Sequence, residues 1–89
     1  MTYLRKKMIE DMQLNGLSKS TQQSYLTSVK QLSRYFNMSP AKLTNEDIRE
    51  FFLYLVNKKK VESSTYSSYL YGIKFFIEKT LEGVGQDLR

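Results

Sequence analysis

The chain has 89 residues, with 14 Lys and Arg against 9 Asp and Glu, which gives a formal net charge of +5 at pH 7. It has no Cys and no His, so disulfides, thiolate metal sites and histidine catalysis are excluded, and we expect no cofactor and no small-molecule substrate. The length suits one small domain, and no apolar run suits a membrane span or a signal peptide, so we expect a cytoplasmic protein without a membrane partner.

Two helices are predicted in the first 36 residues. The first runs from about residue 3 to 13, with Leu4, Met8 and Met12 on a narrow apolar stripe and Gly16 as its C-terminal cap. The second begins after Ser18 or Ser20, where Ser20 and Gln23 match a capping box, and ends near Phe36. Its apolar stripe is Tyr25, Val29, Leu32 and Phe36, and its polar face is Gln23, Thr27, Lys30 and Arg34.

Two further helices are predicted after a loop over residues 37–43. Thr44 caps the third helix with Asp47 three residues on, and its apolar face is Ile48, Phe51, Phe52, Leu55 and Val56. The fourth helix begins after Ser63 or Ser64 and runs to about Leu81, with Tyr66, Tyr69, Leu70, Ile73, Phe76, Ile77 and Leu81 buried. Nothing alternates with period two over a useful length, so the chain is predicted to be all-α.

Hydroxyls and lysines gather where the second and fourth helices begin. The first group is Ser18, Lys19, Ser20 and Thr21, and the second is Lys58, Lys59, Lys60, Ser63, Ser64 and Thr65. Free backbone N–H groups and the helix dipole favour an anion at such a start, and two starts together indicate a phosphate backbone. The same hydroxyls also suit plain helix capping, so both interpretations stay open.

Charge is distributed unevenly along the chain. Glu46, Asp47 and Glu50 crowd the third helix, whereas lysines dominate from residue 58 to 74. The outer face of the fourth helix carries Ser67, Ser68, Tyr71 and Lys74, and we include these four among the residues expected to contact DNA. Lys30 and Arg34 on the second helix are secondary candidates. The pattern favours one basic face over diffuse charge.

The order of these short motifs resembles a known family. The landmarks are Gly16-Leu17-Ser18, Thr21, Tyr25, Tyr35-Phe36, Ser39-Pro40, Leu43-Thr44, Ile48, Tyr54-Leu55, Ser63-Ser64-Thr65 and Ile73-Lys74-Phe75-Phe76. Together they resemble the N-terminal core-binding, or SAM-like, domain of the tyrosine recombinases of the phage-integrase family. The resemblance covers residues 4–81. Asn15 departs from the family, where an arginine often precedes the glycine, so the resemblance does not carry a phosphate contact over to this position.

The resemblance implies a compact, orthogonal four-helix SAM-like bundle that clamps one face of double-stranded DNA. It places a core-binding domain at residues 1–81 and the start of a linker at 82–89, leading to a C-terminal catalytic domain that this chain lacks. The implied function is DNA binding in site-specific integration and recombination, with no enzyme activity of its own. The implied partners are double-stranded DNA, the protein's own catalytic domain and neighbouring protomers.

Two other functions fit parts of the pattern. Leu53, Tyr54 and Phe75 lie off their helices' main stripes, where they either close the bundle over the first helix or form a protein-docking patch. A free-standing helix-turn-helix regulator ranks lower, because the connections between helices are too long or lack glycine. No Asn or Arg lies on the outer face of the fourth helix, which predicts weak base reading.

Overall fold

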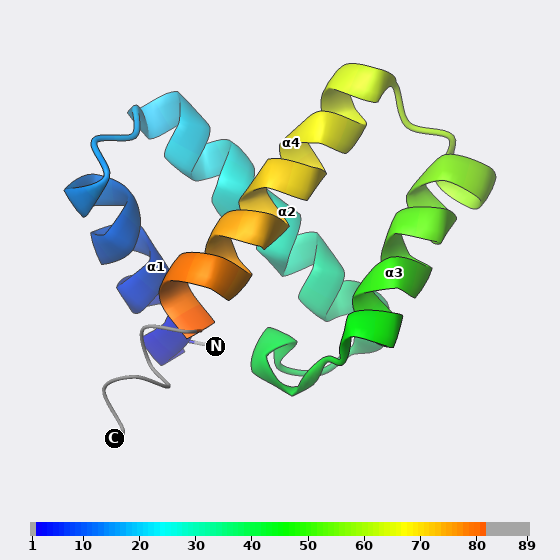
Figure 1. Ribbon diagram of the computed structural model, residues 1–89, viewed down its shortest axis with the longest axis horizontal. Helices are drawn as coiled ribbons and strands as arrows, with labels where there is room; N and C mark the ends of the chain where they lie inside the picture. The colour runs from blue at the N-terminus through cyan, green and yellow to red at the C-terminus, as the bar shows by residue number, and fades with distance from the viewer. Residues whose placement is uncertain (1, 82–89) are drawn as a thin grey trace.

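The computed structural model describes residues 2–81, and almost all of them lie in helices (Figure 1). The α-helices are α1 (Thr2–Leu14), α2 (Lys19–Phe36), α3 (Asn45–Tyr54) and α4 (Ser63–Phe75). A 3₁₀ turn, η1 (Pro40–Lys42), precedes α3, and the wider π-helical turns η2 (Leu55–Lys59) and η3 (Phe76–Leu81) prolong α3 and α4. No strand occurs within these residues, so the predicted all-α four-helix fold is confirmed. None of the described helices is both long and apolar enough to cross a membrane.

Helices α2 and α4 cross at the centre of the molecule, with α1 and α3 on opposite sides of the pair (Figure 1). The crossing is close because Gly72 has no side chain: a Cβ atom there would lie 3.0 Å from both the Tyr25 Cα and the Ser28 Cβ atoms. The buried Ser28 hydroxyl donates to the carbonyl oxygen of Ser24 at 2.9 Å and, across the helix pair, to that of Ser68 at 3.3 Å. This hydroxyl therefore joins the two helix backbones without leaving a polar atom unpaired.

Two apolar clusters lie on either side of this crossing. The first cluster is Met8, Met12, Val29 and Phe76, and the second is Leu32, Phe51, Leu55 and Ile73. Every member is at most 2% exposed, and every member lies on a stripe that helical periodicity predicts. Burying each side chain stabilises the fold by about 1.5–3 kcal/mol. Because α2 contributes to both clusters, and α4 to the second while its extension η3 contributes Phe76 to the first, residues on both sides of the crossing hold the two helices together.

Local signals set the helix ends largely as predicted. Gly16 adopts the left-handed conformation (φ 71°) after α1, and the Gly16 and Leu17 amides donate to carbonyls of the last turn at 3.0 and 3.1 Å. The Thr44 hydroxyl accepts from the Asp47 amide at 3.1 Å, while the Asp47 carboxylate accepts from the Thr44 amide at 3.0 Å. These bonds confirm the C-cap of α1 and the N-cap of α3.

Three local expectations are wrong. The stretch over residues 37–43 is not a plain loop, because Pro40 starts the 3₁₀ turn η1. Val56 and Leu70, both expected in the core, are 53% and 37% exposed. Each lies at the margin of its helix's apolar stripe and faces a hollow between α3 and α4 that none of the described elements covers. Periodicity identifies the stripe but not how far the packing extends across it.

Candidate nucleic-acid interface

Ser18 caps the start of α2. Its hydroxyl oxygen accepts from the Thr21 amide at 3.2 Å, and its O–H donates to the Thr21 hydroxyl oxygen at 3.0 Å. The expected capping box of Ser20 and Gln23 is wrong, because the tight C-cap of α1 brings the chain into α2 two residues earlier. Lys19 and Ser20 are exposed in the first turn, where backbone amides have no acceptor within the helix.

The start of α4 is more open than that of α2. Ser63 is its first residue, and the preceding Glu62 holds the N-cap position without a side-chain hydrogen bond. Ser63, Ser64 and Thr65 are exposed, and within the described part of the chain their hydroxyls form no hydrogen bond. Capping therefore does not occupy the hydroxyls of this turn, and its amides and hydroxyls face solvent together.

The lysine run is held beside the start of α4. Lys58 and Lys59 lie in the π-helical turn η2, and Lys60 follows in the left-handed conformation with φ 54°. The Val61 amide donates to the carbonyl oxygen of Leu55 at 3.1 Å, and the Val61 side chain packs against the second apolar cluster. All three lysines are exposed. The ordered turn thus projects three cations next to the open end of α4.

The outer face of α4 presents most of the other predicted residues to solvent. Ser68 and Lys74 are exposed, Tyr71 is 56% exposed, and Ser67 is half-buried. Lys74 lies beyond Gly72, so it is on the far side of the helix crossing from the two helix starts. The residues predicted to contact DNA are therefore divided between a group around the helix starts and Lys74, which lies further along α4.

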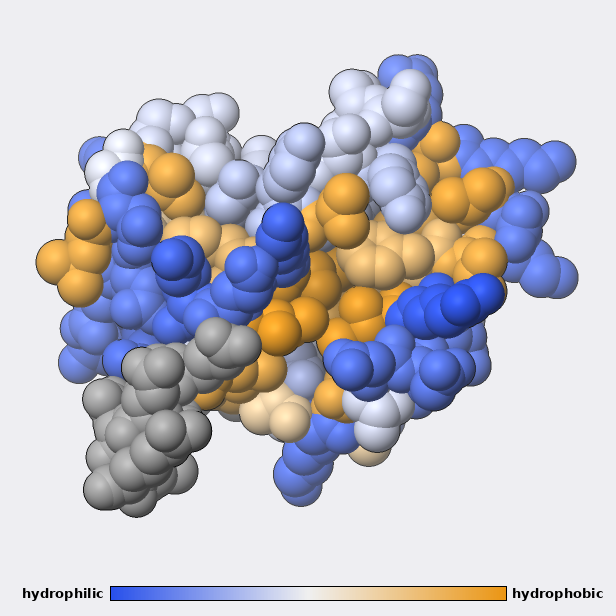
Figure 2. Space-filling view, viewed as in Figure 1, coloured by the Kyte–Doolittle hydropathy of each residue, from blue (hydrophilic) through white to orange (hydrophobic). Residues whose placement is uncertain are grey.

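The crossing brings the two helix starts to the same edge of the molecule. Each start lies about two and a half turns from the contact between Ser28 and Gly72, and both helices run away from that edge (Figure 1). Figure 2 shows pale, weakly polar residues gathered over both starts, with strongly hydrophilic residues beyond the end of α3. We call this surface the start edge: residues 18–21, 58–60 and 63–65.

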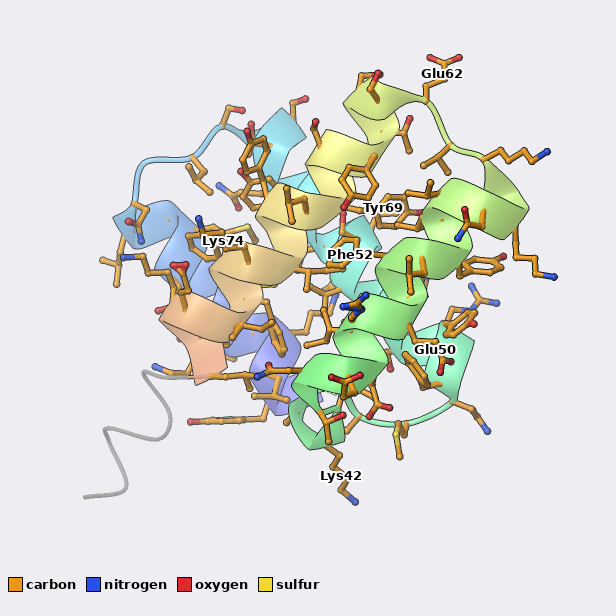
Figure 3. The ribbon with its side chains drawn as sticks, turned by 45° about the vertical axis from the view of Figure 1, so that its right-hand side comes forward. Lys42, Glu50, Phe52, Glu62, Tyr69 and Lys74 are labelled. Carbon is orange, nitrogen blue, oxygen red and sulfur yellow. The ribbon has the colours of Figure 1, made fainter. Side chains whose placement is uncertain are left out.

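The acidic residues of α3 lie away from the start edge. Glu46, Asp47 and Glu50 line a shallow hollow on α3 together with Arg49 and Leu53. Figure 3 shows Glu50 on the side of α3 that is turned away from α4. At the start edge itself, Glu62 at the N-cap of α4 is outnumbered by Lys58, Lys59 and Lys60, so this surface keeps a net positive charge.

An apolar groove between α3 and α4 was not anticipated from the sequence. Two adjoining hollows share Ile48 and Phe52, and their apolar lining continues over Leu53, Val56, Tyr66, Leu70, Ile73 and Ile77. Figure 2 shows it as the hydrophobic centre of the front face, and Figure 3 shows Phe52 lying between the two helices. The exposure of Val56 and Leu70 is the feature that reveals it.

The docking patch expected from Leu53, Tyr54 and Phe75 does not form. Phe75 packs against the first apolar cluster, with its ring centroid 5.9 Å from that of Tyr25. Tyr54 packs against the second cluster, 4.7 Å from the Tyr35 ring, and Leu53 alone of the three is largely exposed, at 48%. The sequence left open whether these residues close the bundle or form a docking patch, and Phe75 packs onto the bundle.

Another hollow, at the junction of α2, η2 and α4, combines tyrosines with cations. Its volume is about 340 Å³, and we call it the tyrosine hollow: Gln31, Arg34, Tyr35, Phe51, Tyr54, Leu55, Lys59 and Tyr69. Figure 3 shows Tyr69 between α4 and α3. The sequence signal was faint, since the pattern predicts Arg34 as a solvent-facing charge, Tyr69 as a core residue and Tyr54 off its helix's apolar stripe.

Comparison with known proteins now adds to this geometry. Residues 4–84 match the family described as phage integrase, N-terminal SAM-like domain. A protein of Sinorhizobium fredii (strain NBRC 101917 / NGR234), named "Putative integrase/recombinase y4qK", is 42% identical over 82 residues, which are 92% of this chain and 27% of that protein. No solved structure gives a significant match. The chain, which spans about a quarter of its relative's length, belongs to the phage-integrase N-terminal SAM-like domain family.

Proposed function

We propose that this chain is the DNA-binding N-terminal domain of a site-specific tyrosine recombinase, and that it contacts the phosphate backbone through the start edge. The observation that carries the proposal is the open start of α4, where solvent-facing amides and hydroxyls lie beside Lys58, Lys59 and Lys60. Amide N–H groups, the helix dipole and ammonium groups all favour the same ligand, a phosphate. The start of α2 adds a second such group along the same edge.

Contacts of this kind favour affinity over sequence specificity. The exposed part of α4 offers Ser68, Tyr71 and Lys74 but no Arg or Asn to make bidentate contacts with a base edge. Phosphate contacts fix the position of a protein on a duplex without reading its sequence. The expected dissociation constant for duplex DNA is therefore on the order of 10⁻⁴ to 10⁻⁶ M, the range of electrostatic binding.

The rest of the recombination reaction belongs to parts outside this chain. We propose residues 1–81 as the core-binding domain, with a linker beginning at 82–89, which lies outside the described residues. The cleavage chemistry would belong to a catalytic domain, consistent with a relative that is named as an integrase/recombinase and of which this chain matches 27%. No reaction is assigned to this chain.

The apolar groove supports a second, compatible function. Its exposed side chains Val56 and Leu70, with the half-buried Phe52 between them, form the kind of surface that protein partners cover. We propose that the catalytic domain or a neighbouring protomer of the full-length protein packs there while DNA occupies the start edge. The groove thus keeps the protein-interaction function, and of the expected patch of Leu53, Tyr54 and Phe75 it includes Leu53.

A salt titration tests the DNA-binding proposal. We expect affinity for a duplex, followed by fluorescence anisotropy, to fall steeply as salt rises, with a log–log slope of about 0.9 for each neutralised phosphate. Docking through an apolar surface responds little to salt, because no counterions are released. A dissociation constant that stays constant with salt, or an absence of duplex binding at low salt, would contradict the proposal.

A further inference from the structure

We infer that the tyrosine hollow binds one unpaired nucleotide of a DNA strand, with the base against its tyrosine rings and the phosphate on Arg34 and Lys59. The inference rests on the proposed function, because Lys59 belongs both to this hollow and to the start edge. It goes beyond that function by assigning a base-binding site apart from the duplex contacts.

The shape and walls of the hollow suit a nucleobase. Its volume of about 340 Å³ lies within the range of small-molecule sites, about 300–1,000 Å³. Tyr35 and Tyr54 lie 4.7 Å apart between ring centroids, and the buried Phe51 ring lies 5.5 Å from Tyr35 and 5.7 Å from Tyr69. Tyr35 is still 40% exposed, so its ring is not fully occupied by its neighbours. Aromatic side chains of this kind stack on unpaired bases.

The charges of the hollow suit a phosphate. Arg34 comes from α2 and Lys59 from η2, so two separate elements bring cations to one hollow. No carboxylate is among the residues that line it, and the amide of Gln31 adds hydrogen-bonding capacity. Arg and Lys bind phosphate oxygens through charge-assisted hydrogen bonds. A base beside a phosphate is what a nucleotide provides.

The base must be unpaired to reach this site. Inside a duplex the two faces of each base are covered by its neighbours, and only the edges are available in the grooves. The rings of the tyrosine hollow can contact a base face only after the base has left the stack. The rings of the hollow therefore add nothing to binding of an intact duplex, which contacts the start edge, Lys59 included.

The test compares two single strands that differ only in their bases. One is an oligothymidylate of about 12 nucleotides, and the other is its abasic analogue with the same phosphates. We expect the full 89-residue chain to bind the oligothymidylate about fivefold more tightly or better, since stacking of one base contributes at least this factor. Equal affinities for the two strands, with duplex binding intact, would overturn the inference and leave the proposed function standing.

Matched variants locate the effect. Tyr35→Leu should abolish the preference for bases, whereas Tyr35→Phe, which keeps the ring, and Tyr3→Leu, which removes an exposed tyrosine on α1, should retain it. Arg34→Gln, at an exposed position that does not depend on core packing, should weaken both strands and lower the salt slope by about 0.7. The inference would be overturned if a folded Tyr35→Leu chain still bound the oligothymidylate more tightly than the abasic strand. It would also be overturned if the salt slope of strand binding by Arg34→Gln equalled that of the original chain.

A peptide separates the two classes of anionic partner. We expect an alternating glutamate–tyrosine peptide of similar length to bind more weakly than the oligothymidylate. Tighter binding of the peptide, lost in Arg34→Gln, would show that the hollow docks an acidic protein segment and would overturn the nucleotide assignment. If the chain bound neither the duplex nor either strand, the proposed function itself would fail.

Discussion

Replacing Lys58, Lys59 and Lys60 together with alanine is expected to lower the log–log salt slope of duplex binding by about 0.9 for each phosphate that the variant no longer neutralises, and so by about 2.7 if each lysine neutralises one phosphate. At low salt this corresponds to a loss of orders of magnitude in affinity. The three side chains are exposed on and after η2, where solvated charges contribute little to folding. The melting temperature should therefore stay nearly constant while the slope falls.

The control for this experiment removes the same charge from other places. Lys6, Lys42 and Lys79 are also exposed, and they lie on α1, η1 and η3 rather than at the start edge. Their joint replacement by alanine lowers the net charge equally and tests the general effect of charge on binding. If this second triple variant reduced the salt slope of duplex binding as much as the first, binding would depend on net charge alone. The assignment of the start edge as the DNA-binding surface would then be wrong.

Gly72→Val is expected to destabilise the fold by about 1–3 kcal/mol, because a Cβ atom at this position meets the backbone of α2 at the Tyr25 Cα, 3.0 Å away. Backbone atoms cannot move aside as a flexible side chain does. Valine has a slightly better helix propensity than glycine, and this gain of a few tenths of a kcal/mol offsets only part of the clash. Thermal unfolding should show a melting temperature lower by about 4–8 °C per kcal/mol.

A double-mutant cycle checks that the close crossing is the cause. Ser28 supplies the second atom at 3.0 Å, its Cβ, so Ser28→Gly removes one side of the clash. The two substitutions together should destabilise less than the sum of their separate effects. Strict additivity, or a Gly72→Val chain as stable as the original, would mean that α2 and α4 do not approach this closely.

The four helices and most of their core were predictable because each signal is local. The stripe of Met8 and Met12, the cap at Gly16 and the box of Thr44 with Asp47 all involve residues within one helix or its ends. Such patterns depend on helical spacing and capping chemistry, which act before any long-range packing. The same reasoning fails at the start of α2, where it predicts a capping box of Ser20 and Gln23. The turn after α1 instead starts the helix at Lys19, with Ser18 as the N-cap.

The surface features depend on tertiary packing and could not be read from periodicity. Val56 and Leu70 are apolar and on the expected stripes, yet they are exposed because the described residues leave the groove between α3 and α4 uncovered. The tyrosine hollow joins Arg34, Lys59 and Tyr69 from three elements, and no sequence spacing connects them. The helix starts themselves were identifiable, because hydroxyls and lysines mark them directly in the sequence.

Chemical-shift mapping with a short duplex tests the assignment of the DNA-binding surface most directly. The start edge predicts that the backbone amides of residues 18–21, 58–60 and 63–65 shift most as DNA is added, because these residues surround the starts of α2 and α4. The amides of α3 around Glu46 and Glu50, on the acidic face, should shift least. Largest shifts on α3, with residues 18–21, 58–60 and 63–65 unchanged, would contradict the start edge as the DNA-binding surface.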